Sequence, residues 1–589
     1  MRYTDIFKTW MVLCLALINF GICYVELDDE AEFQAEVEPT VTIAILARNA
    51  ASNLPWFFGG IENLNYPKHR IDIWISTDHN EDDTESVLKT WIDAMKPLYH
   101  NINLTIGESS RYVDEAGEHL GHWSEMRYDH VIRLRQEALD LARHRWSDYL
   151  LMIDSDQFIH DRNLLRHLIS QDKPVIAPMM NSTSLYTNFW GAVTDDGFYK
   201  RSDDYLDILE RFKTGTFNVP MVHSIFLINL RHEVTRHLQY YPPHPAYVAA
   251  PDDIIQFSFS ARYNNVPMFV TNARYYGSLI PPVEKGPKFL QLVADYGLYI
   301  RLVHIHEELV LEPSKHVPLP PPKFDNKLGF DEIYLINLER RPDRRIMMEQ
   351  ALAELGIEYK YFPAVDGRQL NETYLDQLGV KQLEGYLDPY HKRPMKMGEI
   401  GCFLSHYFIW KEMEEKGYNR ILIFEDDVRF RVNFIRYFYE MMAEADRHIN
   451  GWDLLYIGRK IMQNNEDFVI NSRHLVYPGY TYWTLSYAVT RSGLKKLLAQ
   501  DPIAKMLPVD EYLPIMFGAH TNKEWLEKFF PRDVTALSAN PLFVEPLKYI
   551  GEEGYVSDTE DSLPITESKQ EASSVEVCVS SIRLHVVLL

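Results

Sequence analysis

The sequence contains little cysteine, with 4 residues of this type in 589. Cys14 and Cys23 belong to the amino-terminal segment and Cys578 to the carboxyl-terminal one, so only Cys402 lies in a stretch with the pattern of a folded domain. Because no pair of cysteines falls within such a stretch, the sequence excludes a disulfide framework and a zinc site built on paired cysteines. The folded domains must be held together by their hydrophobic cores.

Several common functional motifs are also missing. The sequence has no G-x-x-x-x-G-K-[ST] phosphate loop, no G-x-G-x-x-G after a strand and no G-x-S-x-G turn, which argues against P-loop, dinucleotide and serine-hydrolase sites. His232 and His237 lie about 140° apart around a helix, whereas a zinc helix of the H-E-x-x-H type needs a spacing of four residues. Positive charge is scarce, since 60 basic against 84 acidic residues give a net charge of −24. A nucleic-acid partner is therefore not expected.

Long apolar runs are absent except near the amino terminus, where the run from Trp10 to Phe20 follows two basic residues. This pattern predicts a cleaved signal peptide over residues 1–23. A single membrane anchor is the alternative, but a span requires roughly 20 apolar residues, and an acidic stretch begins already at Glu26. We therefore expect no membrane span once the signal is removed.

Proline is concentrated in residues 309–328, which cannot form a helix or a central strand and therefore predict a linker. On each side of it, short β-rich runs alternate with helix-like segments, as is typical of α/β folds with parallel sheets. The sequence thus predicts two tandem α/β domains, at residues 24–308 and 329–550. Residues 551–589 are mostly acidic and small polar, and we expect them to form a disordered acidic tail.

Two buried strands of the predicted sheets end in acidic residues. The run from Tyr149 ends in Asp154-Ser155-Asp156, and the run from Ile421 ends in Glu425-Asp426-Asp427. Residues i and i+2 of an extended chain share a face, so the outer two carboxylates of each triplet can converge on one point. A turn or helix cap is one interpretation of such a triplet. Its occurrence in both domains favours the other, a site for a hard divalent cation that holds a diphosphate.

Three stretches of the second domain resemble glycosyltransferase family 25, namely Ile333 to Arg344, Gly398 to His406 and Ile421 to Asp427. The first domain is similar to the nucleotide-sugar transferase domain that precedes it in the procollagen galactosyltransferase branch of this family. Its matching stretches are residues 44–49, 134–139, 149–156 and 219–224. Together the two resemblances cover roughly residues 40–560.

The resemblance implies two tandem type A nucleotide-sugar glycosyltransferase (Rossmann-like) domains. It implies transfer of galactose from UDP-galactose to hydroxylysine of collagen or of proteins with collagen domains, with inversion to a β-galactosyl product and with Mn²⁺ as the metal. The metal would be held by Asp154, Asp156, Glu425 and Asp427. The donor would be bound by Arg48, Arg135, Asn337, Arg340, Arg344 and Glu399.

Some of these residues allow a purely structural interpretation. The arginines near Asn337 suit a phosphate through their fixed donors, but they also suit a solvated first helical turn. Glu399 can orient a substrate or stabilise a helix amino terminus. Cys402 and His406, four residues apart, are interpreted as core packing.

An inverting transfer also needs a general base beside the acceptor hydroxyl. Two acidic pairs are candidates, each ahead of an apolar helix-like segment: Asp252 with Asp253 in the first domain, and Asp510 with Glu511 in the second. Asp is also a preferred helix N-cap, so the base and the cap remain open for each pair. His223 is a weaker candidate, as a further metal ligand.

The resemblance places the protein in the lumen of the endoplasmic reticulum. Three Asn-X-Ser/Thr sequons fit a lumenal chain and predict glycosylation at Asn103, Asn181 and Asn371. The sequence ends without a K-D-E-L type tetrapeptide, so its retention stays open.

Two alternative functions remain at this stage, a lumenal or cell-surface binding protein that keeps the fold without the chemistry, and a transferase of another sugar or acceptor. Homo-oligomerisation also stays open.

Overall fold

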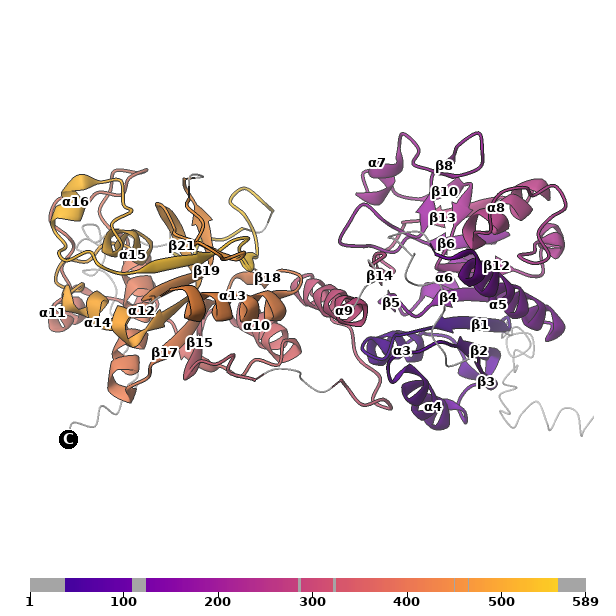
Figure 1. The fold of residues 1–589 in the computed structure, drawn as a ribbon, viewed down its shortest axis with the longest axis horizontal. Helices are drawn as coiled ribbons and strands as arrows, with labels where there is room; N and C mark the ends of the chain where they lie inside the picture. Colours follow the sequence, from indigo (N-terminus) through magenta and orange to yellow (C-terminus); the bar gives the residue numbers. More distant parts are fainter. Residues whose placement is uncertain are drawn as a thin grey trace, which may run out of the picture.

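The computed structural model describes residues 38–107, 123–283, 288–320, 325–449, 451–463, 466–553 and 555–559. Figure 1 shows two α/β units with helix α9 (Phe289–His306) between them. The predicted signal peptide lies outside the described residues. Among the residues described, no helix is both long enough and apolar enough to cross a membrane.

The sheet of the first unit has 8 strands in the order β10-β13-β6-β12-β4-β1-β2-β3. The strands are β1 (Val41–Ala47), β2 (Ile71–Thr77), β3 (Asn101–Ile106), β4 (Tyr149–Asp154), β6 (Val175–Pro178), β10 (Thr216–Val219), β12 (Ile225–Asn229) and β13 (Met268–Thr271). One face packs on α3 (Leu54–Glu62), α4 (Thr84–Met95) and α6 (Leu164–Ser170). The other face packs on α5 (Glu125–His144), α7 (Tyr205–Leu209) and α8 (Asp253–Tyr263).

The sheet of the second unit has 7 strands in the order β16-β15-β17-β21-β19-β22-β20. The strands are β15 (Glu332–Asn337), β16 (Lys360–Pro363), β17 (Arg420–Glu425), β19 (Leu454–Ile461), β20 (Leu475–Val476), β21 (Thr481–Thr490) and β22 (Ala536–Ala539). One face packs on α11 (Glu372–Leu378), α12 (Met397–Lys416), α14 (Arg491–Ala499), α15 (Val509–Met516) and α16 (Lys523–Glu527). The other face packs on α10 (Pro342–Glu354) and α13 (Phe434–His448).

Both sheets are buried on their two faces, which explains why the central strands are continuous apolar runs. In β4, Leu151 and Ile153 pack into one hydrophobic core, while Leu150 and Met152 pack into the other. Successive side chains of a strand point to opposite faces, so each strand contributes to both cores. The acidic residues come where these runs end and the chain leaves the core.

The two units share one topology around the acidic strand. Strand β4 pairs in parallel with β1 and antiparallel with β12, and β17 pairs in parallel with β15 and antiparallel with β21. After the acids, β5 (Gln157–Ile159) pairs with β14 (Gly277–Leu279), and β18 (Val428–Phe430) pairs with β23 (Val544–Pro546). This repeated arrangement confirms the predicted fold class, two tandem type A domains.

The sheets are mixed, whereas the sequence pattern predicted parallel ones. In the first unit, β12 runs antiparallel to both of its neighbours. Strand β10, between β6 and β12 in the chain, also runs antiparallel to its neighbour β13. Hydrophobic runs do not encode the direction of a strand, which is why this feature was missed.

Helix α9, assigned to the first domain from the sequence, contacts both units. The Arg301 guanidinium stacks on the Trp56 ring of the first unit at 3.6 Å from its centroid, and its Nε donates to the Glu354 carboxylate of the second unit at 3.0 Å. Asp295 of the same helix lies 3.5 Å from the Arg436 guanidinium.

The described part of the chain extends into the segment predicted as a disordered tail. Residues 551–553 and 555–559 are described, and Asp558 forms ion pairs with arginines of the second unit. Opposite charge explains the difference, because a composition argument sees the acidic residues but not the cations that they meet. The rest of the predicted tail, residues 560–589, lies outside the described residues.

Candidate active site

In the first unit, the predicted metal acids line a cavity of about 490 Å³ at the carboxyl-terminal edge of the sheet. Asp154 is the last residue of β4, and Asp156 follows in the turn before β5. Arg48, Arg135 and Asp253 line the same cavity. The structure thus brings together most of the predicted site residues of this unit.

A buried arginine occupies the centre of this first cluster. The Arg135 side chain, from α5, donates from Nη2 to the Asp154 carboxylate at 3.0 Å and from Nε to the Asp253 carboxylate at 2.7 Å. Arg135 is 5% exposed, so both ion pairs are shielded from water. Arg135 is therefore a fixed counter-ion of the acids, which differs from the predicted donor contact.

Several atoms of the first cluster nevertheless fit a cation. Within the described part of the chain, Asp154 Oδ1, Gln157 Oε1 and His223 Nε2 are buried without a hydrogen-bond partner. Burial, and then the charge of Asp154, raise the pKa of Asp156 to about 7. Burial lowers the pKa of His223 to about 3, so its imidazole is neutral and keeps a lone pair. Oxygen and imidazole ligands of this kind suit a divalent cation.

In the second unit, Glu425 ends β17 and its carboxylate is held from two sides. The Thr484 hydroxyl donates to Glu425 Oε1, and His406 Nε2 lies 3.3 Å from the same oxygen. His406 is fixed in turn, because its Nδ1 is 3.0 Å from the Tyr487 hydroxyl, to which the Trp410 indole donates. Figure 1 shows α12, which carries His406, beside β17.

The other two acids of the second triplet differ in their contacts. Asp426 accepts from Asn337 Nδ2 at 2.6 Å and from Arg344 Nη1 at 3.2 Å, so both of its oxygens are engaged. Asp427 Oδ1 and Asn337 Oδ1 are buried and have no hydrogen-bond partner among the residues that the structure describes. Burial and the charges of Glu425 and Asp426 raise the pKa of Asp427 to about 7. An oxygen-ligand cation at Glu425 and Asp427 would relieve this repulsion, so the residues present fit such a metal.

The two units thus differ in the side chain that contacts the first acid of the triplet, Asp154 or Glu425. Each takes the partner of this acid from the helix that precedes the acidic strand, Arg135 for Asp154 and His406 for Glu425. An arginine is permanently charged and competes with a cation, whereas a histidine is a residue type that can itself bind a metal. On this comparison the second unit is the better cation site.

Cys402, His406 and Glu425 each offer one ligand atom within 4.8 Å of the others. The sequence analysis interpreted Cys402 and His406 as core packing, and both are indeed packed in α12. Their contact with Glu425 was missed, because a spacing of four residues shows only that they share a helix face.

The candidate bases of the first unit are both engaged. Asp253 is held by Arg135, as described above. Asp252 caps α8, accepting from the Ile255 backbone N–H at 2.9 Å, and also accepts from the Tyr199 hydroxyl. Burial and the charge of Asp253 raise the pKa of Asp252 to about 6. Asp252 therefore caps a helix, as one of the two interpretations predicted, whereas Asp253 forms an ion pair with Arg135.

In the second unit the two candidate bases, Asp510 and Glu511, differ in their contacts. Glu511 is buried and accepts from Tyr480 Oη at 2.9 Å, Tyr482 Oη at 2.6 Å and His520 Nε2 at 2.7 Å. Asp510 is half-buried, and among the described residues its carboxylate has no hydrogen-bond or ion-pair partner. Burial and the charges of Glu511, Glu399 and Glu425 raise the pKa of Asp510 to about 8. Of the two acids, Glu511 is therefore held in place by its hydrogen bonds, whereas the Asp510 carboxylate is not held by another described side chain.

The other residues predicted to bind the donor differ in the contacts that they make. Arg344 and Asn337 both donate to Asp426 of the second acid triplet, whereas Arg340 donates from Nε to Asp366 at 3.1 Å. Arg48 lines the first cavity, and its Nε donates to the His79 backbone oxygen at 3.2 Å. Glu399 accepts from Arg393 and from the Lys396 backbone N–H at 2.6 Å. These contacts support the interpretation in which it stabilises the start of α12, and its contact with a donor stays a prediction.

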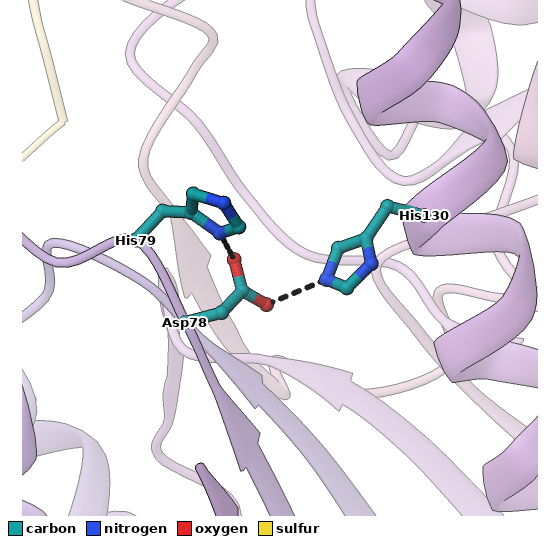
Figure 2. A group of neighbouring side chains, drawn as sticks. All are labelled: Asp78, His79 and His130. Atoms are coloured by element: carbon teal, nitrogen blue, oxygen red, sulfur yellow. Dashed lines mark hydrogen bonds and ion pairs between the residues drawn. The ribbon is translucent and has the colours of Figure 1, made fainter. Parts of the chain in front are cut away.

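One group near the first cavity escaped the sequence analysis. Asp78, at the end of β2, accepts from His79 at 2.7 Å and from His130 of α5 at 2.9 Å (Figure 2). Burial opposes its ionisation, but the two imidazole hydrogen bonds outweigh burial and lower the pKa of Asp78. The sequence did not indicate this group, because a single Asp after a strand is not a recognisable motif and its partner His130 lies far away in the sequence.

The predicted glycosylation sites occupy different positions. Asn103 in β3 and Asn371 are exposed, and the Asn371 side chain also caps α11. Asn181 is half-buried, and its side-chain oxygen accepts from Arg211 at 3.2 Å. Glycosylation of each site stays a prediction.

Replacing Arg135 by Met should destabilise the protein by about 3–5 kcal/mol, the typical cost of leaving buried charges without their partner. Asp154 and Asp253 would both lose their counter-ion. The free energy of unfolding of the first unit, measured by chemical denaturation, tests this. The control is Lys89→Met, which breaks an exposed pair with Glu85 in α4 and should cost less than about 1 kcal/mol. Equal losses in the two variants would contradict the central role of Arg135.

Comparison with known proteins gives the following similarities. The family model "Glycosyltransferase family 25, N-terminal domain" matches residues 38–295, and "Glycosyltransferase family 25 (LPS biosynthesis protein)" matches residues 330–513. Procollagen galactosyltransferase 2 of Mus musculus is 45% identical over 528 residues, which cover 89% of this chain and 84% of that protein. A Bos taurus protein named "Probable inactive glycosyltransferase 25 family member 3" is 44% identical over 533 residues, covering 89% and 88%. Among solved structures, GalNAc-T7 with UDP, GalNAc and Mn²⁺ is 14% identical with a TM-score of 0.29, covering 49% of this chain and 53% of that chain.

Proposed function

The chain belongs to glycosyltransferase family 25, and we propose that it transfers galactose from UDP-galactose to hydroxylysine of collagen, with the chemistry in its second unit. The relatives named procollagen galactosyltransferase support the sugar and the acceptor. The observation that carries the assignment to the second unit is the contrast between Asp510, which has no partner among the described residues, and Asp253, which is ion-paired with Arg135.

The metal in this proposal is Mn²⁺, held by Glu425 and Asp427. When bound there, the cation would stabilise the negative charge that develops on UDP as the sugar leaves. His406 and Thr484 orient Glu425 for this task through its Oε1. Asn337 and Arg344 engage both oxygens of Asp426 and thereby fix the turn that carries Asp427.

The donor phosphates lie against the guanidinium groups of Arg340 and Arg344 in our proposal. Asp510 then accepts the proton of the acceptor hydroxyl as that oxygen attacks the sugar from the side opposite UDP, which gives inversion. Burial and then the charges of Glu511, Glu399 and Glu425 raise the pKa of Asp510, which supports our placing Asp510 near the acids of the proposed metal site. The first unit has a cavity of about 490 Å³ at its acids, but we assign no transfer to it, because its candidate bases are engaged.

A lumenal setting is part of the same proposal. The apolar run from Trp10 to Phe20 and the three sequons support entry into the endoplasmic reticulum.

The proposed function is tested with matched collagen peptides that carry either lysine or hydroxylysine at one position. Incubation with UDP-galactose and Mn²⁺ should label only the hydroxylated peptide, because lysine offers no oxygen nucleophile to Asp510. Labelling, read by mass spectrometry, should disappear when a chelator replaces the metal. Labelling of both peptides, or full labelling in chelator, would overturn the acceptor or the metal respectively. Parallel reactions with UDP-glucose in place of UDP-galactose show which of the two sugars the protein transfers.

A further inference from the structure

A carboxylate of the chain itself fills the arginine cluster of the proposed donor site. Asp558 Oδ1 accepts from Arg340 Nη1 at 2.5 Å, and Asp558 Oδ2 accepts from Arg341 Nη1 at 2.9 Å. Arg344 Nη1 lies 3.3 Å from Oδ2, and its Nη2 donates to the Val556 backbone oxygen at 3.0 Å. The Asp558 side chain is 10% exposed, so three guanidinium groups enclose one carboxylate.

The arginine cluster does not depend on Asp558 for its arrangement. Each arginine has another acidic partner in the second unit: Arg340 with Asp366 at 3.1 Å, Arg341 with Asp343 at 3.2 Å and Arg344 with Asp426 at 3.2 Å. All three of these partners lie in or near the elements that carry the arginines, at the edge of the second sheet. If Asp558 withdrew, three oriented cations would remain around an open position. Such a fixed set of guanidinium donors is a built anion site, and phosphate is the anion that its geometry suits.

The location of the cluster connects it to the reaction. Arg344 bridges Asp558 to the acid triplet, since its Nη1 is also 3.7 Å from Asp427. A diphosphate held by a cation at Glu425 and Asp427 would lie near Arg344, which also contacts the Asp558 carboxylate. The two anions would then compete for one position.

We propose that Asp558 is an internal competitor of the donor phosphate, which must leave before the nucleotide sugar binds to the second unit. The inference rests on the proposed function for the identity of the donor. It adds that the segment around Asp558 regulates access to the site. A diphosphate brings more charge than one carboxylate and also contacts the cation, so the donor displaces Asp558, while the empty site stays protected from other anions.

The consequence for binding is a reduced apparent affinity. The affinity of a site that is open for only a fraction of the time falls by that fraction. If Asp558 fills the site for nine-tenths of the time, its removal should tighten UDP binding about tenfold.

The test is titration calorimetry of UDP with Mn²⁺ on the full chain, in a background carrying Asp156→Asn to weaken the cation site of the first unit. Asp558→Asn and Asp558→Ala should each lower the apparent Kd about tenfold, and inorganic pyrophosphate should show the same direction of change. The matched control is Glu553→Gln, which removes an exposed acid of the same segment and should leave the Kd unchanged. Thermal unfolding of every variant is recorded alongside.

An unchanged or raised Kd in both folded Asp558 variants would overturn the competition. The outcome is distinguishable from a failure of the proposed function. If Asp427→Asn abolishes transfer but the Asp558 variants bind UDP like the parent, the function stands and Asp558 is only a structural contact. If the Asp558 variants bind pyrophosphate more tightly but Asp427→Asn transfers normally, the anion site stands and the assignment of the donor site falls.

Discussion

Replacing Asp427 by Asn should lower the rate of galactose transfer by at least about 100-fold, the usual loss when one group that stabilises developing charge is removed. The amide keeps the size of the side chain but removes the charge that the cation needs. Because the residue acts on the leaving group, kcat should fall, while KM for the acceptor peptide should change little. Initial rates with hydroxylysine peptide at saturating Mn²⁺ provide the measurement.

The matched control is Asp156→Asn, the same change at the equivalent position of the first unit. It should keep most of the transfer activity, since the bases beside it are engaged by Arg135 and by the cap of α8. Loss of activity in Asp156→Asn alone would place the chemistry in the first unit and contradict our assignment. Neither variant should lower the unfolding temperature. The pKa of each acid is raised to about 7 by burial and by neighbouring acids, so ionisation of these acids near neutral pH opposes folding.

Replacing Asp510 by Asn should lower kcat by about 100-fold to 10,000-fold, the range for loss of a general base. It should also change the pH dependence. A base acts only when it is ionised, and burial and neighbouring acids raise the pKa of Asp510 to about 8, so the wild-type rate should rise with pH up to a pKa at or below this value. A cation near Glu425 stabilises the Asp510 carboxylate and moves the pKa downward. The rising limb that belongs to Asp510 should disappear in Asp510→Asn.

Stability separates this effect from a folding defect. Since the folded-state pKa of Asp510 is raised, its ionisation costs folding free energy above pH 4, and the cost grows until about pH 8. The Asn variant avoids this cost and should unfold at a temperature no lower than the wild type at neutral pH. An Asp510→Asn protein that is fully folded and transfers at the wild-type rate would exclude Asp510 as the base.

The sequence alone carried much of the fold and part of the site. Strands such as β4 and β17 are short, continuous apolar runs because both faces of the sheet are buried, and this local pattern is readable. The acidic residues at the ends of these strands could also be predicted from the sequence, since their position depends only on where an apolar run stops. Asn337 and the arginines after β15 follow the same rule.

Only the tertiary structure determined which hydrogen-bond and ion-pair partners those residues have. Arg135 was expected at the donor, but in the fold it neutralises Asp154 and Asp253, two residues from distant parts of the chain. Glu511 and Asp510 look alike in sequence, yet only Glu511 meets tyrosines and a histidine. Composition predicted disorder for the segment that holds Asp558, because its arginine partners lie more than 200 residues away. Apolar runs and strand ends follow from neighbours along the chain, whereas charge, protonation and availability depend on neighbours in space.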